Sequence, residues 1–502
     1  MPRFNPATDL KIIRIPMSDF QLGIYEEERI DERKQELRNA RKKKKAQNGV
    51  YEETKSSYRI FSRLACNFVC PRPFISCPKP RDHIHFELNE DDIGEEDVDA
   101  IEIRERVLNE EGQYEADDIE RVIEEHKNWK EDYARAIQET LSSLWENRAR
   151  FLTPAALEEY SPKFLNILEN ITESDHVGLH LIYSQFRQLQ GIGILRLVLL
   201  ANGFSEFKIR KNSLGRWILD MSPEDIAKPS FALYTGTESA EEKEIIRNIY
   251  NSSWNDVPIS IVEQIQTKSP NNFYGEIIKV LMITASGAEG IDLKNVRYVH
   301  LTESYWHPVR LEQVIGRAKR ICSHNDLPAD LQTVEVFLYL MTFSQEQIEN
   351  KLSTELKLKD RSDIDRRPIS TDEKLFEVAT IKENINKQLL KAIKETSIDC
   401  TINPDNTDLQ CYSFGNPSST SFSYLPEMTE EEDDEAARAN RREVTWKAVK
   451  ITILGIDYAY NEVTRELYDL DSYIRKNPLK VGTLEVSVNS RTGKKEFKII
   501  RV

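Results

Sequence analysis

The chain is poor in the features that mark several classes of protein. It has 6 cysteines among 502 residues, far from the dense disulfide framework of a small secreted domain, and sparse cysteine fits a reducing compartment. No apolar run approaches the roughly 18 residues that a membrane-spanning helix needs. Residues 1–19 contain no apolar stretch of signal-peptide length. We therefore expect an intracellular protein, cytoplasmic or nuclear.

Basic residues are also outnumbered in this chain. The 69 Lys and Arg against 85 Asp and Glu give a net charge of −16, which does not attract nucleic acid at long range. Much of the acid is concentrated in residues 87–125 and 430–435, which we interpret as solvated insertions or loops. Away from them the chain is close to neutral, so the composition leaves room for a local basic groove.

Two regions make up the N-terminal and central parts. Residues 1–160 predict a helical extension, with helices over 25–47 and 119–150 and an acidic insertion. Residues 161–360 alternate apolar strand patterns with helical patterns, which predicts an α/β domain with a mainly parallel sheet flanked by helices. The expected strands cover residues 178–183, 231–234, 280–285, 296–301 and 334–341.

Two further regions follow. Residues 361–440 combine a linker, a helix over 373–395 and a loop rich in Ser, Asn and acid. Residues 441–502 alternate short β patterns, such as 447–454 and 482–488, and predict a small C-terminal α+β module. We find no internal repeat.

The most informative segment begins with the strand over 280–284 and the loop over 286–293. In an open α/β sheet the loop after the carboxyl end of a strand is where ligands sit. Gly287 and Gly290 allow a tight turn and a close approach to a ligand. Asp292 offers an acceptor to a ribose hydroxyl or to an arginine. The loop alone is also compatible with a purely structural turn.

A helix expected over 309–320 carries the second half of this pattern. Gln313, Arg317 and Arg320 are spaced to share one helix face. Gly316 costs about 1 kcal/mol relative to Ala inside a helix, which makes sense if a nucleotide or another backbone passes close by. Arginine suits bidentate contact with phosphate oxygens. The alternative to a phosphate-contacting helix is an ordinary basic surface helix. The glycine loop that precedes the helix argues against this alternative.

The loop and the helix resemble motifs V and VI of superfamily 2 helicases, in the order and spacing of Swi/Snf-type ATPases. Residues 180–186 resemble motif IV, and residues 233–238 resemble the strand and turn that follow it. The resemblance implies a C-terminal, RecA-like motor lobe. In such a lobe Arg317 and Arg320 would reach the γ-phosphate of ATP as arginine fingers, and Gln313 would position water or nucleotide.

The same resemblance implies two further groups of site residues. The nucleotide edge would be formed by Gly287, Gly290, Asp292 and Gly316. The nucleic-acid backbone would be contacted by Ser184, Gln185 and Ser286.

Shorter segments resemble helicase-type proteins of large nucleocytoplasmic DNA viruses. That family includes the poxvirus early transcription factor small subunit and nucleoside triphosphate phosphohydrolase I. The resemblance implies an ATP-driven role on DNA in viral transcription, and a location that includes the virion or viral factory. The segments are residues 161–164, 306–310, 320–324, 371–375, 392–395 and 467–469.

The sequence contains no Gly-x-x-x-x-Gly-Lys-Ser/Thr string, whose amides and lysine hold phosphates in ATPases. Residues 212–216 come closest, with one glycine and no lysine after it. The segments at 90–92 and 371–373 contain neighbouring acidic residues, and we interpret both as solvated turns. Residues 15–21 resemble the segment that follows the first lobe in this family. We therefore expect ATP and Mg²⁺ to be held mainly by a first RecA-like lobe, in the same or a separate polypeptide, and no hydrolysis by this chain alone.

A metal site is not expected. Cys66, Cys70 and Cys77 precede His83 and His85, but structural zinc usually needs a tight Cys-x₂₋₄-Cys pair followed by a second pair. Here the second pair would be Cys77 with a histidine, at irregular spacing among prolines. We expect ordinary buried or free thiols there.

Three alternatives stay open. The lysines at 42–45 fit a solvated helix end or a nucleic-acid contact. The aromatic residues 305–307 fit a packing anchor or a base-stacking platform. The whole chain also fits a non-catalytic interaction subunit of a viral transcription complex that docks on RNA polymerase or another partner.

Overall fold

The computed structural model describes residues 1–45, 59–78, 116–285, 290–350 and 360–397, the single residues 400 and 409, and residues 448–501 with short gaps. These residues fall into two compact units, Met1–Asn384 and Ile385–Val502. Among the helices in these ranges, none is long and apolar enough to cross a membrane.

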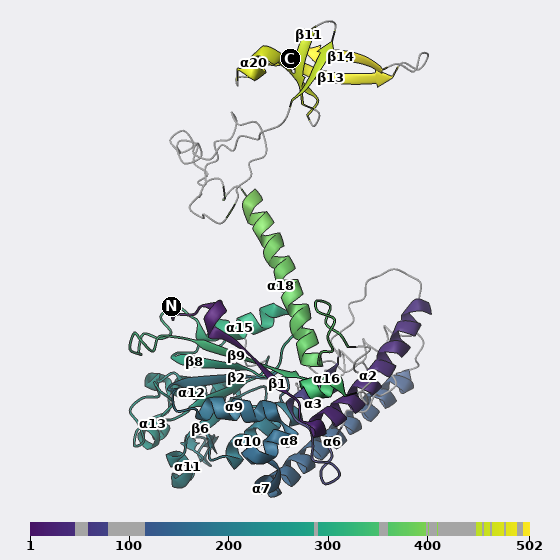
Figure 1. Cartoon of the computed structure of the whole chain (residues 1–502). Helices are drawn as coiled ribbons and strands as arrows, with labels where there is room; N and C mark the ends of the chain where they lie inside the picture. The colour runs from purple at the N-terminus through teal and green to yellow at the C-terminus, as the bar shows by residue number, and fades with distance from the viewer. Residues whose placement is uncertain are drawn as a thin grey trace. The chain divides into compact units, whose positions relative to one another are not determined.

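The first unit is built on a seven-stranded sheet in which every neighbouring pair of strands runs parallel. Helices cover both of its faces (Figure 1). The predicted α/β fold with a parallel, helix-flanked sheet is confirmed. In spatial order the strands are β1 (Leu10–Pro16), β9 (Glu335–Thr342), β8 (Val296–Leu301), β2 (Leu179–Tyr183), β7 (Val280–Ile283), β6 (Ser230–Tyr234) and β3 (Ser205–Glu206).

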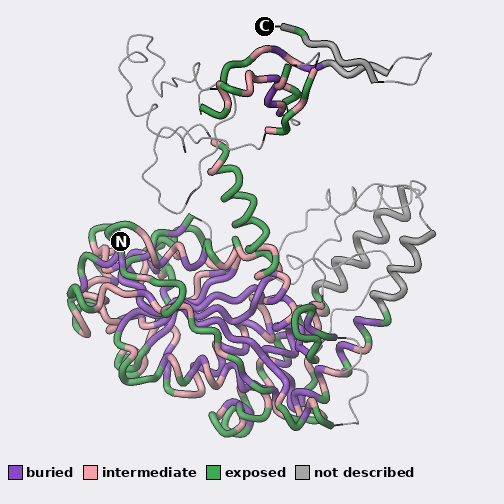
Figure 2. Tube along the Cα trace, turned by 45° about the horizontal axis from the view of Figure 1, so that its top comes forward, coloured by how far each residue is buried: buried purple, intermediate pink, exposed green. Residues whose placement is uncertain are grey.

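The central strands are apolar because both faces of the sheet are buried. Every residue of β2, β7 and β8 is buried, and Figure 2 shows the sheet as the buried centre of the unit. Successive side chains of a strand point to opposite faces. Phe337 and Tyr339 of β9 accordingly lie in one apolar core, whereas Leu338 and Leu340 lie in the other.

The N-terminal region contributes a strand that the sequence did not lead us to expect. Residues 1–160 were assigned to a helical extension, yet β1 pairs parallel with β9 along its whole length, from Leu10 opposite Val336 to Pro16 opposite Thr342. Proline is tolerated on an edge strand because one side needs no ladder hydrogen bond. The sheet therefore draws on residues well before position 161.

Helices of the N-terminal region pack on one face of the sheet. The two long helices expected over 25–47 and 119–150 correspond to α2 and α6. Thr153 and Ser161 cap α8 and α9, each followed by proline at the first helical position. The helices are α1 (Pro6–Asp9), α2 (Asp19–Lys45), α3 (Ile60–Asn67), α6 (Ala116–Glu146), α7 (Arg148–Phe151), α8 (Pro154–Tyr160) and α9 (Pro162–Thr172).

The remaining elements of this unit lie between its strands or follow the last of them, β9. A two-stranded hairpin of β4 (Ile209–Lys211) and β5 (Trp217–Leu219) stands apart from the main sheet. The helices are η1 (Leu189–Gly193), α10 (Ile194–Ala201), α11 (Pro223–Ala227), α12 (Ala240–Tyr250), η2 (Trp254–Asp256), α13 (Ile259–Ile265), α15 (Pro308–Ala318), α16 (Gln345–Glu349) and α18 (Thr371–Thr396). The last of these was expected over 373–395, and it continues into the second unit.

Besides the end of α18, the described residues of the second unit form a five-stranded antiparallel sheet and a further short helix, as expected for a small C-terminal module. Its buried core is small and centres on Tyr458, Leu467 and Leu484. Its elements are β10 (Val449–Ile453), β11 (Ile456–Tyr460), β12 (Glu466–Asp469), α20 (Leu470–Ile474), β13 (Lys480–Val488) and β14 (Lys495–Arg501).

The cysteines correct one expectation. We predicted thiols, but Cys70 and Cys77 are joined by a disulfide whose Cα atoms are 5.6 Å apart. Cys66 remains a free thiol, and burial raises its pKa well above the usual value. Residues His83 and His85 lie outside the described residues. Within the described part of the chain, no three His, Cys, Asp or Glu side chains are grouped to hold a metal ion.

Candidate nucleotide-binding edge of the sheet

Three loops with predicted site residues meet at one edge of the sheet. Because the strands are parallel, the carboxyl ends of β2, β7 and β8 share that edge, which is where ligands bind in open α/β sheets. The loops that leave these strands begin at residues 184, 284 and 302. The fold therefore brings the loop at 184 to the same edge as two loops that begin 100 or more residues later in the chain.

The loop after β7 is anchored by its apolar residues and leaves its acidic residue in solvent. Ser286 and Gly287, both expected in the site, lie outside the described residues, as do 288 and 289. Gly290 has a φ of +71°, which only glycine adopts readily. Ile291 and Leu293 are buried in the core. The side chain of Asp292 between them is 61% exposed.

Helix α15 presents polar side chains away from its packed face. Val314 and Ala318 are fully buried, which fixes the helix on the sheet. Gln313 is exposed and Arg317 is half-buried. Their spacing of four residues places both on the same helix face. The structure therefore brings Gln313 and Arg317 together as we expected from the sequence.

Arg320 does not lie on this helix, which corrects the prediction of a helix over 309–320. Helix α15 ends at Ala318. The hydroxyl of Ser323 donates to the carbonyl oxygens of Ala318 at 3.4 Å and Arg320 at 2.9 Å, and Cys322 takes a left-handed φ of +61°. These side-chain bonds satisfy carbonyls at the helix end and turn the chain away.

Instead, Arg320 reaches back to the glycine loop. Its Nη1 lies 3.1 Å from Oδ1 of Asp292, and its Nη2 donates to the carbonyl of Ile291 at 2.7 Å. Of the two partners that we considered for Asp292, this structure shows the arginine. Asn251 holds the same loop from α12, with its amide donating to the carbonyl of Asp292 at 2.8 Å. The loop and the arginine thus form one hydrogen-bonded unit.

Arg317 differs from Arg320 in having a free donor. Its Nε is shielded from solvent and has no hydrogen-bond partner among the described residues. A Cβ added to the neighbouring Gly316 would meet no heavy atom of the described chain within 4 Å. Packing against the described residues outside its own helix backbone therefore does not require glycine at position 316. An unpaired guanidinium donor beside an open helix surface fits an anionic group that approaches from outside.

Ser184 and Gln185, expected to contact nucleic acid, lie inside the protein. The hydroxyl of Ser184 is fully buried and donates to Oε1 of Glu303 at 2.7 Å. The backbone nitrogen of Gln185 donates to Oε2 of the same carboxylate at 3.0 Å, and its side-chain oxygen accepts from Arg63. Their surroundings leave the expected nucleic-acid contact without support.

Glu303 belongs to a buried polar cluster that the sequence analysis missed. Lys163 is fully buried, with Nζ 2.7 Å from Oδ2 of Asp372 and 3.0 Å from Oδ1 of Asn67. Asn67 in turn donates to Glu303. Burial raises the pKa of Glu303, and Lys163 and the hydrogen bonds oppose that shift. The sequence signal that could have pointed to this cluster was a single glutamate just after an apolar strand.

Asp372 corrects a further expectation. We interpreted residues 371–373 as a solvated turn, but Asp372 is fully buried at the start of α18. Besides Lys163, its Oδ2 accepts from the backbone nitrogen of Met341 at 3.1 Å, at the end of β9. The cation and the amide both contact Oδ2 and offset the cost of burying the charge, whereas Oδ1 has no hydrogen-bond partner among the described residues. The pair joins α9, β9 and α18.

The aromatic segment at 305–307 lies at the start of α15. Tyr305 is nearly buried, and its ring centroid is 5.6 Å from that of Trp306. Lys382 of α18 places its Nζ 4.2 Å from the centre of the Trp306 ring. The tyrosine is thus a packing anchor, and Trp306 is partly covered by a cation.

Comparison with known proteins identifies the central part of this unit. The family model described as "Helicase conserved C-terminal domain" matches residues 229–322. That range includes β6, β7, β8 and α15. It therefore contains the glycine loop and both arginines.

Curated viral proteins match more of the chain. A putative ATP-dependent RNA helicase of Acanthamoeba polyphaga mimivirus is 26% identical over 463 residues, which are 86% of this chain and 50% of that protein. A second from the same virus is 30% identical over 52% of this chain and 37% of its own length. A termination factor NPH-I homolog of African swine fever virus is 29% identical over 51% of this chain and 35% of its own length.

The chain thus spans half or less of the length of these relatives. The solved C-terminal part of the Fun30 ATPase domain aligns with 76% of this chain and 97% of its own, at 14% identity and a TM-score of 0.33, too loose a likeness to support an argument. The parallel sheet flanked by helices has the RecA-like α/β form, and the family match lies within it. Residues 229–322 therefore match the helicase conserved C-terminal domain, and the chain is similar to viral proteins named as putative ATP-dependent RNA helicases and as a termination factor homolog.

Proposed function

We propose that this chain supplies the second motor lobe of an ATP-driven helicase or translocase that works on nucleic acid, DNA in the first instance, during viral transcription. Arg317 carries the proposal. It combines a shielded guanidinium donor without a partner in the described chain and a position on the exposed face of α15. The names of the viral relatives, an ATP-dependent helicase and a termination factor, support the same role.

In this proposal ATP lies between α15 and a first lobe, in the same or another polypeptide, that holds the β-phosphate and Mg²⁺. Arg317 contacts the γ-phosphate and stabilises the charge that develops on it during transfer. Such an arginine finger is worth about 10³ to 10⁵ in rate. Gln313, one helical turn earlier, positions water or nucleotide.

Asp292 and Arg320 have a different role from Arg317. The ion pair at 3.1 Å and the bond to the carbonyl of Ile291 tie the end of α15 to the glycine loop. We assign Asp292 the positioning of Arg320, which then turns toward phosphate only when it leaves this pair. Gly290 and Gly316 have no side chain, which leaves room for a nucleotide to approach the backbone. Both lobes would contact nucleic acid, and viral RNA polymerase is the expected larger partner.

The test is ATP hydrolysis by the chain joined to, or mixed with, a first lobe that carries a phosphate-binding loop. We expect nucleic-acid-stimulated turnover by the pair and none by the chain alone. Replacing Arg317 by Ala lowers kcat of the pair by about 10³-fold or more. Arg317→Lys also fails, because lysine keeps the charge but loses the planar fork.

A matched control is Arg135→Ala. Arg135 is an exposed arginine that pairs with Asp132 on α6, and its loss leaves kcat unchanged. Turnover of the Arg317→Ala pair at the rate of the unaltered pair overturns the proposal. Hydrolysis by the unaltered chain alone overturns the division of roles between the two lobes.

A further inference from the structure

The hairpin of β4 and β5 is an appendage on the edge of the sheet. It follows β3, whose carboxyl end lies on the same edge as the nucleotide site because all strands of the sheet are parallel. The strands pair antiparallel from Ile209 opposite Leu219 to Lys211 opposite Trp217. The main sheet does not need the hairpin for its own ladder, since β3 pairs only with β6.

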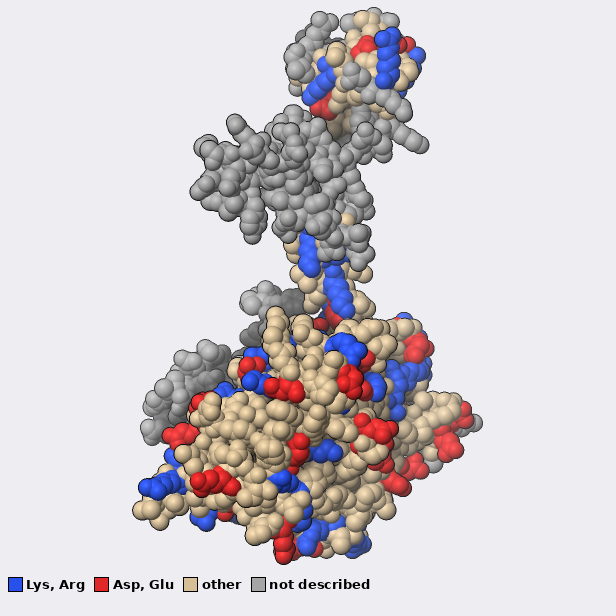
Figure 3. Space-filling model, turned by 90° about the vertical axis from the view of Figure 1, so that its left-hand side faces the viewer, with Lys and Arg blue, Asp and Glu red and all other residues tan. Residues whose placement is uncertain are grey.

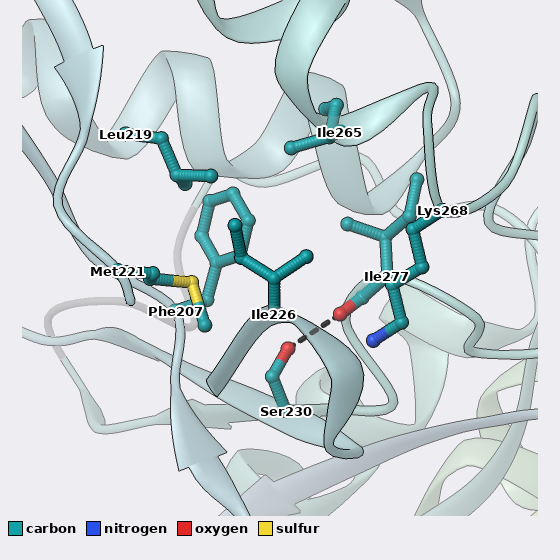
Figure 4. A pocket seen from close by; sticks show the side chains of 8 residues that line it. All are labelled: Phe207, Leu219, Met221, Ile226, Ser230, Ile265, Lys268 and Ile277. Atoms are coloured by element: carbon teal, nitrogen blue, oxygen red, sulfur yellow. Dashed lines mark hydrogen bonds between the residues drawn. The ribbon is translucent and has the colours of Figure 1, made fainter. Parts of the chain in front are cut away.

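The root of the hairpin is fixed by apolar packing. Phe207 and Leu219, at its two ends, are buried in the same core as Ile265. Figure 4 shows the three side chains around one small pocket, together with Met221 and Ile226. Residues on both sides of the hairpin are thus held in the core, and the hairpin itself rests on the domain, with Ile209 buried and the carbonyl of Trp217 accepting from Ser260 of α13 at 2.7 Å.

The tip is also locally ordered. The side chain of Asn212 accepts from the backbone nitrogens of Leu214 and Arg216, both at 3.0 Å, an arrangement that rigidifies a turn. Gly215 supplies the left-handed φ of +73° that closes it. Leu214 projects from this turn and is 77% exposed.

The exposed surface of the hairpin is basic in an acidic protein. Residues 207–220 contain four basic side chains and one acidic side chain, whereas the whole chain has a net charge of −16. Lys208, Arg210, Lys211 and Arg216 are all exposed. Figure 3 shows acidic and basic side chains mixed over a face of the first unit. The excess of basic side chains over residues 207–220 thus differs from the net acidic charge of the chain.

Three of the four cations are in ion pairs at the protein surface. Arg210 lies 2.8 Å from Asp220, and Lys211 lies 2.6 Å from Glu241 at the start of α12. Lys208 lies 3.1 Å from Glu206. Exposed pairs are worth roughly 0–1 kcal/mol and are screened by salt, so a phosphate can displace the carboxylates.

We propose that this hairpin binds the phosphodiester backbone of a nucleic acid. Arg210, Lys211 and Arg216 contact phosphates, and the exposed Leu214 packs against a sugar or base at the tip. The inference rests on the proposed function in that a motor lobe works on nucleic acid. It adds a contact that lies on this chain alone and needs neither ATP nor the first lobe.

The experiment measures binding of the full chain to fluorescein-labelled duplex DNA, single-stranded DNA and single-stranded RNA by fluorescence anisotropy, over about 50 to 200 mM salt. The triple variant Arg210→Ala, Lys211→Ala, Arg216→Ala is expected to bind about 10-fold or more weakly. Its plot of log K against log salt is expected to be shallower by about 2 to 3, because each lost phosphate contact removes about 0.9. Comparison of the three labelled probes identifies which backbone the hairpin prefers.

Two further variants separate charge from folding. A control triple, Lys34→Ala, Arg135→Ala, Lys391→Ala, removes three cations that also sit in exposed pairs and is expected to bind like the unaltered chain. A charge-keeping triple, Arg210→Lys, Lys211→Arg, Arg216→Lys, is expected to retain binding. Equal binding by the alanine triple and the unaltered chain overturns the hairpin contact and leaves the motor proposal intact. Failure of the unaltered chain to bind any probe also overturns the hairpin contact. The proposed motor role is then still tested separately by the ATPase assay of the Arg317 variants.

Discussion

At the scale of single residues, the two arginines of the site have separate surroundings. Arg320 is held by Asp292 and the carbonyl of Ile291, whereas Arg317 keeps a donor without a partner in the described chain. From their spacing in the sequence, we expected both arginines to contact the γ-phosphate of ATP. The division arises because α15 ends at Ala318 and the chain then turns back to the glycine loop.

Gly316→Ala separates folding from function at this site. No heavy atom of the described chain lies within 4 Å of the added Cβ, and alanine favours the helix interior by about 0.5–1 kcal/mol. We expect a higher free energy of unfolding of the chain and a lower turnover of the chain paired with a first lobe. Urea denaturation and the ATPase assay measure the two effects. A destabilised variant would show that position 316 is already crowded within this chain.

Lys163 gives a second prediction for a single residue. Its ammonium and the carboxylate of Asp372 are both fully buried and 2.7 Å apart. Lys163→Met leaves that carboxylate without its cation, which costs about 3–5 kcal/mol. We expect this loss in urea denaturation, with part of it recovered in the double variant Lys163→Met, Asp372→Asn. A loss below about 1 kcal/mol would mean that Met341 and the other neighbours suffice for the carboxylate.

At the scale of elements, three neighbouring strands share a buried line of polar rings. His180 of β2 and His300 of β8 approach to 3.0 Å between ring nitrogens, and His300 lies 2.8 Å from the hydroxyl of Tyr339 on β9. The rings stack across the sheet. Burial lowers the pKa of His180, and His300, Lys279 and His176 add to that shift. Burial lowers the pKa of His300 to about 3, and His176 adds to that shift.

These shifts predict acid sensitivity of the sheet. A histidine that is neutral in the folded state contributes its full stability above its unfolded pKa of about 6.5 and loses it as the pH falls below that value. We expect the free energy of unfolding to drop between pH 6.5 and 5, by up to about 1.4 kcal/mol per pH unit for each such histidine. The variant His300→Gln should show a flatter dependence over the same range. An unchanged slope would mean that His300 does not titrate differently in the two states.

At the scale of the whole molecule, the domain borders drawn from the sequence do not match the compact unit. Its sheet takes an edge strand from residues 10–16, and its core includes Tyr25 and Phe68. Asp372, beyond the border at 360, anchors Lys163 and Met341. This compact unit therefore includes segments that precede and follow the expected α/β region, residues 161–360.

This arrangement predicts how fragments behave. A fragment of residues 161–360 loses β1, α3 and the start of α18, which exposes β9 and leaves Lys163 buried without Asp372. We expect it to be insoluble or to lack a cooperative thermal transition, whereas residues 1–384 give a soluble protein with a single transition. Scanning calorimetry of the two fragments is the measurement. A stably folded 161–360 fragment would show that the flanking segments are dispensable.

Much of the fold could be read from local patterns. The five central strands are apolar because both faces are covered, and such runs stand out in a sequence. Strand β1 was missed because its exposed edge allows Lys11 and Arg14 within it. The helix over 309–320 was drawn two residues too long because nothing local revealed the Ser323 hydroxyl that ends it.

The sequence by itself determined the α/β class, the glycine loop and Gln313 with Arg317 on one helix face, since these depend on periodicity, on backbone freedom and on spacing within one element. Tertiary structure alone decided that Arg320 pairs with Asp292, that Ser184 and Gln185 surround Glu303, and that Lys163 meets Asp372. Each of those contacts joins segments far apart in the chain. Their formation depends on which strand ends the sheet brings to a common edge, and no local pattern encodes that.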